Sequence, residues 1–415
     1  MTMMHFTRRT LLASGAAIAP ALAFGAAIKP KAKPKAALHQ RLICLDTHLD
    51  TPMNFARPGW DIMQRHSYAQ DLTQIDYPRM VEGGLDGGFW AIYTGQGPLT
   101  DDGYADARDR ALLRGLAIRE MVASHPAHFE LATRADDAAR IAAKGKRIVY
   151  MSIENSYPLG KDISLLDTFF KFGVRLAGPV HSSNNQFADS ATDKAGKIWN
   201  GLSPLGKEWL AAINRLGIVP DASHASDDVF DQMVEMSKSP VLLSHSSCKA
   251  VHDHPRNIDD DRIKKLAASG GVIQINSLSG YLIDTPKIPE REAAQGAVYA
   301  QLRDLPTLSP AEAKVKIAET AKAMQDINAK YPVPRATFDD YMKQMLHALD
   351  LVGPEHVGVG CDWDGGGGVT GMEDIAALPK ITDRLVKAGY SESDLEQIWG
   401  GNVLRVLRRA ESIRA

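Results

Sequence analysis

The sequence predicts an α/β fold, a (β/α)₈ TIM barrel, and three observations lead to it. Eight short apolar runs are separated by longer amphipathic stretches, which is the pattern of strands buried on both faces and covered by helices. No glycine-rich phosphate loop follows the first run, as it would in the alternative fold, a doubly wound sheet. The 415 residues, 44% hydrophobic and 24% charged, are enough for one large core.

The N-terminus has the pattern of a bacterial export signal. Arg8 and Arg9 precede an apolar stretch rich in Ala and Gly, and Ala21-Leu22-Ala23 then offers small residues for cleavage. Paired arginines before such a stretch indicate twin-arginine export, so we expect a signal peptide at 1–26 and a periplasmic or secreted protein. The apolar stretch is too short for a convincing membrane span, and no stable membrane anchor is expected. A Pro/Lys linker follows at 27–37.

The folded part is expected to be a single barrel domain covering 38–415. Helices are expected at 104–124, 205–216, 227–237, 259–268 and 337–352. An insertion with several prolines and a charged helical centre, at about 284–335, follows the seventh strand, where a barrel carries loops of its active-site face. We expect it to be a lid or a specificity element. The strands are predicted, in order, at 42–45, 88–93, 148–153, 174–177, 217–220, 241–243, 271–275 and 357–360.

Charge and cysteine content exclude some classes of protein. The 48 basic and 50 acidic residues give a formal net charge of -2, so nothing indicates a nucleic-acid partner. The three cysteines, Cys44, Cys248 and Cys361, are too few for a disulfide scaffold, and the sequence leaves open whether two of them pair. Buried small side chains are the simplest interpretation of all three.

Histidines and carboxylates follow six of the eight predicted strands. Because the carboxyl ends of barrel strands lie on one face, these side chains are expected to converge. A single residue of this kind is usually structural, but six convergent strand ends indicate a functional site. The residues are Asp46, His48 and Asp50 after the first strand, Glu154 after the third, His181 after the fourth, Asp221 and His224 after the fifth, His245 after the sixth, and Asp362 and Asp364 after the eighth.

These residue types predict a binuclear metal centre. His48 and Asp50, two apart on an extended strand end, point to the same side and can hold one ion, while His224 and His245 can hold another. Glu154 can place one carboxylate oxygen on each ion. Two such ions would hold a bridging hydroxide as nucleophile, which favours a metal-dependent hydrolase. Zinc is the expected metal, although other divalent ions suit the same ligands.

Several separated motifs occur in a recognisable order from about residue 41 to the C-terminus. They are Asp46-Thr47-His48-Leu49-Asp50, Ser152-Ile153-Glu154, Asp221-Ala222-Ser223-His224, Ser244-His245, Arg256-Asn257 and Gly358-Val359-Gly360-Cys361-Asp362-Trp363-Asp364-Gly365. Together they resemble the membrane (renal) dipeptidase family of the amidohydrolase superfamily, which usually has Gly where this sequence has Asn155. The resemblance implies a barrel of metal-dependent hydrolase type, two zinc ions, and hydrolysis of dipeptides with a free C-terminal carboxylate.

The resemblance also implies roles for three residues beyond the metal ligands. His181 would bind the substrate and donate a hydrogen bond to the oxyanion. Arg256 would bind the substrate carboxylate with two parallel hydrogen bonds. Asp362 would carry the proton from the attacking water to the leaving amine, whereas Asp364 is expected to be structural. The family also implies a homodimer.

The metal site alone leaves the substrate open. The same site could act on another amide, such as an L-Xaa-D-Xaa peptide, an N-acyl amino acid or a β-lactam, or it could tailor a secreted peptide natural product. Asn155-Ser156, the surroundings of His181 and the insertion at 284–335 keep these alternatives in view. A metal-binding scaffold without hydrolysis is a third hypothesis, and the complete ligand set and Asp362 argue against it.

Overall fold

The computed structural model describes residues 37–414. Its β-strands form two sheets, and all strand pairs in these sheets are parallel. The signal predicted at 1–26 and the linker at 27–37, except its last residue, lie outside the described residues. A second sheet has the order β7 (Leu242–Ser246), β8 (Val272–Ile275) and β9 (Val357–Val359). The first sheet has the order β1 (Leu45–Leu49), β2 (Gly87–Tyr93), β4 (Arg147–Glu154), β5 (Val174–Ala177) and β6 (Val219–Pro220), with β3 (Phe129–Leu131) beside β4 and off this path.

Single parallel bridges link the edges of the two sheets. Asp221, directly after β6, pairs with Leu242 of β7, and Leu49 of β1 pairs with Trp363 beyond β9. The sequence predicts one continuous barrel, whereas the structure shows a parallel α/β fold hydrogen-bonded as two sheets. One of the two separations lies at the two-residue strand β6, where Pro220 has no N–H to donate to a neighbouring strand, and the other lies between β9 and β1. Side chains from strands of both sheets nevertheless share one buried cluster with α14 (Asn402–Ser412).

Each of the eight predicted strands overlaps an observed one, but the first boundary is wrong. The structure begins β1 at Leu45 and continues it through His48, which the sequence places beyond the strand end. All five residues of β1 are buried. The strand tolerates a buried Asp46 because its carboxylate accepts hydrogen bonds from the backbone N–H groups of His48 and Cys361. Hydrophobicity alone does not reveal such a polar strand, and it also misses the short β3.

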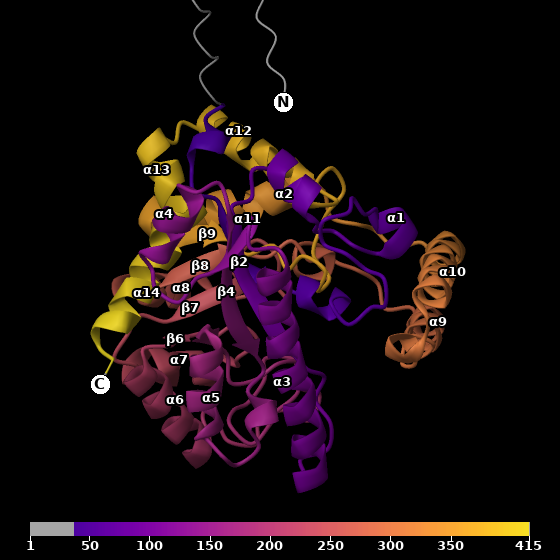
Figure 1. Ribbon diagram of the computed structural model, residues 1–415. Helices are drawn as coiled ribbons and strands as arrows, with labels where there is room; N and C mark the ends of the chain where they lie inside the picture. Colours follow the sequence, from indigo (N-terminus) through magenta and orange to yellow (C-terminus); the bar gives the residue numbers. More distant parts are fainter. Residues whose placement is uncertain (1–36, 415) are drawn as a thin grey trace, which may run out of the picture. The chain divides into compact units, whose positions relative to one another are not determined.

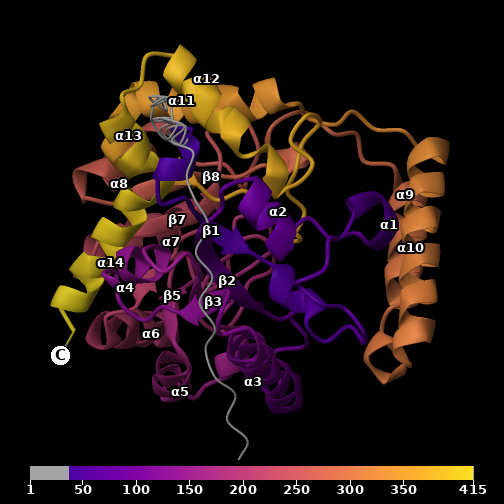
Figure 2. The ribbon, with the colours of Figure 1, turned by 45° about the horizontal axis from the view of Figure 1, so that its top comes forward.

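Helices surround the strands (Figures 1 and 2). Side-chain caps mark several helix starts: Ser203 accepts from the N–H of Gly206, and Ser309 and Glu312 form a capping box. The helices before α14 are α1 (Tyr68–Asp71), α2 (Tyr77–Glu82), α3 (Asp101–Ser124), α4 (Asp137–Ala142), α5 (Leu165–Phe172), α6 (Pro204–Leu216), α7 (Asp227–Met236), α8 (Asp260–Ala268), α9 (Pro289–Ala300), α10 (Pro310–Lys330), α11 (Phe338–Val352), α12 (Pro379–Lys387) and α13 (Glu392–Glu396).

The insertion predicted at 284–335 consists largely of α9 and α10. Both helices lie beside α1, to one side of the strands, in the two views (Figures 1 and 2). The three cysteines, Cys44, Cys248 and Cys361, are buried and free. Among residues 37–414, none of the helices combines the length and the hydropathy that crossing a membrane requires.

Candidate metal centre

The five predicted metal ligands lie together in the structure. His48 is in β1, with Asp50 directly after it, and Glu154 is the last residue of β4. His224 follows β6 by four residues, and His245 lies in β7. All five residues are buried, with exposed fractions between 1% and 7%. The carboxyl ends of four strands from both sheets therefore deliver three imidazoles and two carboxylates to one point.

Glu154 lies between two groups of these side chains. Its Oε1 atom is 3.0 Å from Nε2 of His224 and 3.4 Å from Nε2 of His245. Its Oε2 atom is 3.4 Å from Nε2 of His48, and that nitrogen is 3.2 Å from Oδ2 of Asp50. One carboxylate thus faces the histidine pair with one oxygen and the His48–Asp50 pair with the other.

The donor set fits divalent metal ions. Ligand atoms of His48, Glu154 and His245 lie within 4.8 Å of one another, and so do those of two further groups that add His181 with His224 and Asp50 with Asp362. The Nε2 atoms of His224 and His245 are 2.9 Å apart. Two imidazole nitrogens that converge on carboxylate oxygens are the donors that zinc and similar ions take.

Burial and the charges of neighbouring groups together determine the protonation of these side chains. Burial lowers the pKa of His224 and of His245 well below the usual range, which leaves neutral imidazoles with a lone pair to donate. Burial also acts against the charge of His48, but Glu154 and Asp50 together raise its pKa well above the usual range. Burial raises the pKa of Asp362, and Asp50 and Glu154 add to that effect. The carboxylates around His48 therefore create a negative environment that favours a positively charged group beside them.

Backbone strain is concentrated at the same place. Asn155, His224, Asp362 and Asp364 all have φ of 65°, in the left-handed region that non-glycine residues rarely adopt. Each follows β4, β6 or β9 at the end where the ligands gather. A left-handed residue there turns the chain sharply at the strand end. Such strain costs on the order of 1–3 kcal/mol per residue and is typical of functional sites.

The structure brings His181, Arg256 and Asp362 to the same site. His181 Nε2 is 3.6 Å from Glu154 Oε1, and its ring centroid is 4.0 Å from that of His224. Asp362 Oδ1 is 3.9 Å from His48 Nε2. Arg256 is only 4% exposed and donates hydrogen bonds to Ser246 Oγ and to the carbonyl oxygen of His245, at 2.9 and 2.8 Å. No carboxylate of residues 37–414 forms an ion pair with this guanidinium.

Asp364 has the structural surroundings that the sequence predicts. Its carboxylate accepts hydrogen bonds from Thr51 Oγ1, at 2.7 Å, and from the backbone N–H of Gln74, at 2.6 Å. Its own N–H donates to Gln74 Oε1. These contacts connect the segment after β9 to the segment after β1. Of the two aspartates, Asp362 is therefore the one that lies with the metal-ligand cluster.

Sequence reasoning missed two aromatic residues at the site. Tyr93 ends β2, and its ring centroid is 4.9 Å from that of His181. Tyr281 lies under Arg256, whose guanidinium carbon is 5.7 Å from the centre of the ring. Tyr93 was visible as the last residue of a predicted strand, but a search for histidines and carboxylates passes over it.

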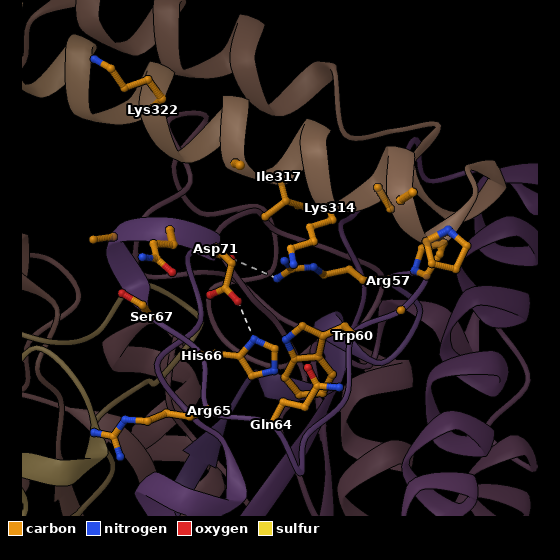
Figure 3. A pocket seen from close by; sticks show the side chains of 18 of the residues that line it. Arg57, Trp60, Gln64, Arg65, His66, Ser67, Asp71, Lys314, Ile317 and Lys322 are labelled. Atoms are coloured by element: carbon orange, nitrogen blue, oxygen red, sulfur yellow. Dashed lines mark hydrogen bonds and ion pairs between the residues drawn. The ribbon is translucent and has the colours of Figure 1, made fainter.

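One cavity adjoins the ligand cluster, and a second, larger one is lined by other residues. A cavity of about 510 Å³ adjoins Asp50 and Tyr93. A cavity of about 750 Å³ lies between the 57–71 segment and α10, and none of the predicted site residues lines it. In Figure 3, Asp71 lies between His66 and Arg57, with Lys314 of α10 above them. The insertion therefore builds a wall of this second cavity, and its role as a lid stays a prediction.

Parallel strands that present histidines and carboxylates at their carboxyl ends define a metal-dependent hydrolase of the amidohydrolase type. A sequence model of the membrane dipeptidase family (peptidase family M19) matches residues 33–415, and the chain belongs to that family. The family and the enzyme class predicted from the motifs are confirmed: the protein is a metal-dependent dipeptidase.

Individual relatives agree with this assignment. Dipeptidase tcpJ of Claviceps purpurea is 29% identical over 379 residues, which are 89% of this chain and 77% of the relative. Dipeptidase 3 of Rattus norvegicus is 26% identical over 378 residues, 89% of this chain and 65% of the relative. The crystal structure of the probable dipeptidase PvdM from Pseudomonas aeruginosa superimposes with a TM-score of 0.76 at 29% identity, covering 91% of this chain and 97% of the other.

Proposed function

We propose that this protein is an exported dipeptidase with two zinc ions, one held by His48 and Asp50 and the other by His224 and His245, with Glu154 shared between them. The observation that carries the proposal is the position of Glu154, whose two oxygens face the two pairs separately. When bound, the ions would supply an activated water nucleophile and polarise the scissile carbonyl. A mononuclear site would not need a carboxylate facing both groups.

The chain's own residues complete the reaction in this proposal. Arg256 binds the C-terminal carboxylate, and His181 donates a hydrogen bond to the oxygen of the scissile carbonyl as negative charge develops on it. Asp362 takes a proton at its carboxylate from the attacking water and returns it to the leaving amine. The burial of Arg256 and Asp362 strengthens both interactions because water competes less.

The proposed barrel and the proposed location have separate support. The bridges Asp221–Leu242 and Leu49–Trp363 join both edges of the two sheets, which supports a closed (β/α)₈ barrel as the underlying architecture. Arg8 and Arg9 support export by the twin-arginine route to the periplasm or beyond. The homodimer expected from the resemblance stays a prediction.

A substrate panel tests the proposed function. Purified protein loaded with zinc is expected to bind two ions per chain, measured by elemental analysis, and to hydrolyse L-Xaa-L-Xaa or L-Xaa-D-Xaa dipeptides. N-acyl amino acids and a β-lactam belong in the same panel because the metal site could act on those amides. Two bound zinc ions with no turnover of any dipeptide would contradict the proposal.

Replacing Arg256 by Met is expected to raise KM for free dipeptides by roughly 10- to 150-fold, since hydrogen bonds to a charged group contribute about 1.5–3 kcal/mol. The guanidinium has a buried Nε–H without a hydrogen-bond partner among residues 37–414, so donors remain for a carboxylate. Dipeptide amides, which lack the carboxylate, are the matched control. If Arg256 binds the carboxylate, the variant should bind amides and free acids about equally; an unchanged KM for free acids would remove this role.

A further inference from the structure

The cavity of about 510 Å³ beside the metal centre carries an arginine that the proposed mechanism does not use. Asp50 and the end of β2 form one wall, and α3, which runs beside β2, forms another (Figure 1). The volume is within the range of small-molecule sites. Its charged and larger polar lining residues are Asp50, Tyr93, Gln96, Asp106, Arg110 and Arg114.

Arg114 is the unbalanced charge in this cavity. Arg110 forms an ion pair with Asp106 at 2.8 Å on the same helix. Asp50 lies 3.2 Å from His48 and belongs to the metal centre. Arg114 is half-buried and has no hydrogen bond or ion pair with any of residues 37–414. Burial lowers the pKa of Arg114, and the negative charge of Asp50, which forms no ion pair with it, opposes that effect only in part.

A half-buried guanidinium without an anionic partner is costly unless a ligand provides one. Removing an arginine from water without a hydrogen-bonded counter-ion carries a desolvation penalty. The fold gains no ion pair from Arg114 in return. A fork of N–H donors that faces a cavity next to a catalytic centre is suited to bind a carboxylate.

The position of the cavity identifies which part of a dipeptide would enter it. Arg256, proposed to bind the C-terminal carboxylate, follows β7 and hydrogen-bonds to its end. The cavity lies at the ends of β1 and β2. In the sheet order, β2 is followed by β4, β5 and β6, and a single bridge then leads to β7. The two strands β2 and β7 are therefore four positions apart. Glu154 is the last residue of β4 and His181 follows β5, so both residues, which surround the expected position of the scissile carbonyl, lie at strand ends between them.

We propose that this cavity is the subsite for the side chain of the amino-terminal residue, and that Arg114 makes it select an acidic side chain. The inference rests on the proposed function, because it takes the direction of the dipeptide from Arg256. The preferred substrates are then Glu-Xaa and Asp-Xaa dipeptides, with the side-chain carboxylate held by Arg114. The positive α-amino group stays near the acidic side of the cavity at Asp50.

The wild-type enzyme itself provides the first test. With Ala fixed at the C-terminal position, kcat/KM for Glu-Ala is expected to exceed that for the isosteric Gln-Ala by about tenfold to hundredfold, since only the charge differs. Leu-Ala and Lys-Ala should be poorer still. Equal values for Glu-Ala and Gln-Ala would overturn the inference while leaving the proposed function intact. No turnover of any dipeptide would contradict the proposed function instead.

Variants of α3 assign the preference to one residue. R114Q is expected to reduce the Glu-Ala to Gln-Ala ratio to near one and to leave Leu-Ala turnover within a few-fold, whereas R114K should keep part of the preference. R108Q is the matched control, because Arg108 lies on the same helix and does not line the cavity. If R114Q lowered turnover of every dipeptide equally and released metal, Arg114 would act through Asp50, and the subsite would be wrong.

A binding measurement makes the test independent of turnover. A reduced-amide isostere of Glu-Ala, which cannot be hydrolysed, is expected to bind the wild-type protein about tenfold or more tightly than the Gln-Ala isostere in calorimetry. R114Q should remove the difference and R108Q should preserve it. Indistinguishable affinities in the wild-type protein would overturn the inference.

Discussion

Replacing Asp362 by Asn is expected to lower kcat by about 10²–10⁴-fold, the contribution of a positioned proton-transfer group, while two metal ions stay bound. Asn has the same shape as Asp and still offers an oxygen to the side-chain amide of Asn276, which lies 3.4 Å from Asp362 Oδ2. It cannot take up or release a proton near neutral pH. Steady-state kinetics and elemental analysis of the same preparation check the two halves of this prediction.

The metal content decides between two roles for Asp362. Its Oδ1 is 3.9 Å from His48 Nε2, close enough that His48, Asp50 and Asp362 also form a possible ligand group. Loss of one ion in the Asn variant would make Asp362 a ligand rather than a proton carrier. Full activity would exclude both roles.

Asp364→Asn is the matched control for this substitution. Asp364 has the same left-handed backbone but is bound to Thr51 and Gln74. Its replacement leaves the backbone N–H of Gln74 with a weaker acceptor, so the expected result is a loss of about 1–3 kcal/mol in the free energy of unfolding. Turnover should fall far less than in the Asp362 variant.

The sequence predicts the strands and the ligand cluster because both depend on local patterns. Apolar runs mark strands that are buried on both faces, and parallel topology then brings their carboxyl ends together. The strand pattern and the parallel topology were sufficient to place four ligands at one site, namely His48, Glu154, His224 and His245. The first boundary failed because β1 continues through the polar residues Asp46 and His48. The Asp46 carboxylate is compensated by the N–H of Cys361, which follows β9 and is distant in sequence.

Asn155 shows how the structure explains a departure from the family pattern. The residue after Glu154 has φ of 65°, which glycine adopts freely and asparagine tolerates better than most other residues. The substitution of Asn for the family's usual Gly therefore preserves the turn that follows β4. Its side-chain oxygen also accepts hydrogen bonds from the N–H of Tyr157 and from Asn185 Nδ2.

The cavity beside Asp50 could not be predicted from the sequence. Arg114 lies within a helix that presents basic and acidic residues along much of its length, and only packing shows which of them face solvent and which face the site. The same applies to the insertion. Its prolines and charges predict helices and loops, but the placement of α10 against α1 depends on tertiary contacts.

Replacing Glu154 by Gln is expected to reduce metal binding below two ions per chain and to lower kcat/KM by on the order of 10³-fold. Even residues that only orient metal ligands contribute about 10–100-fold to affinity, and Glu154 would touch both ions, so its loss should exceed that range. Gln keeps the shape but replaces one carboxylate oxygen by an amide that cannot act as a ligand. Elemental analysis, with kinetics at saturating zinc, measures both effects.

Two further variants separate the bridging role of Glu154 from the simple loss of charge. Glu154→Asp keeps the charge but shortens the reach, so it should retain one ion and little activity if a single carboxylate must face both groups. Glu120→Gln removes an exposed carboxylate from α3 and should change neither property. Because the proposal depends on one oxygen facing each pair, two tightly bound ions and normal turnover in Glu154→Gln would mean that the ions are held without a shared carboxylate.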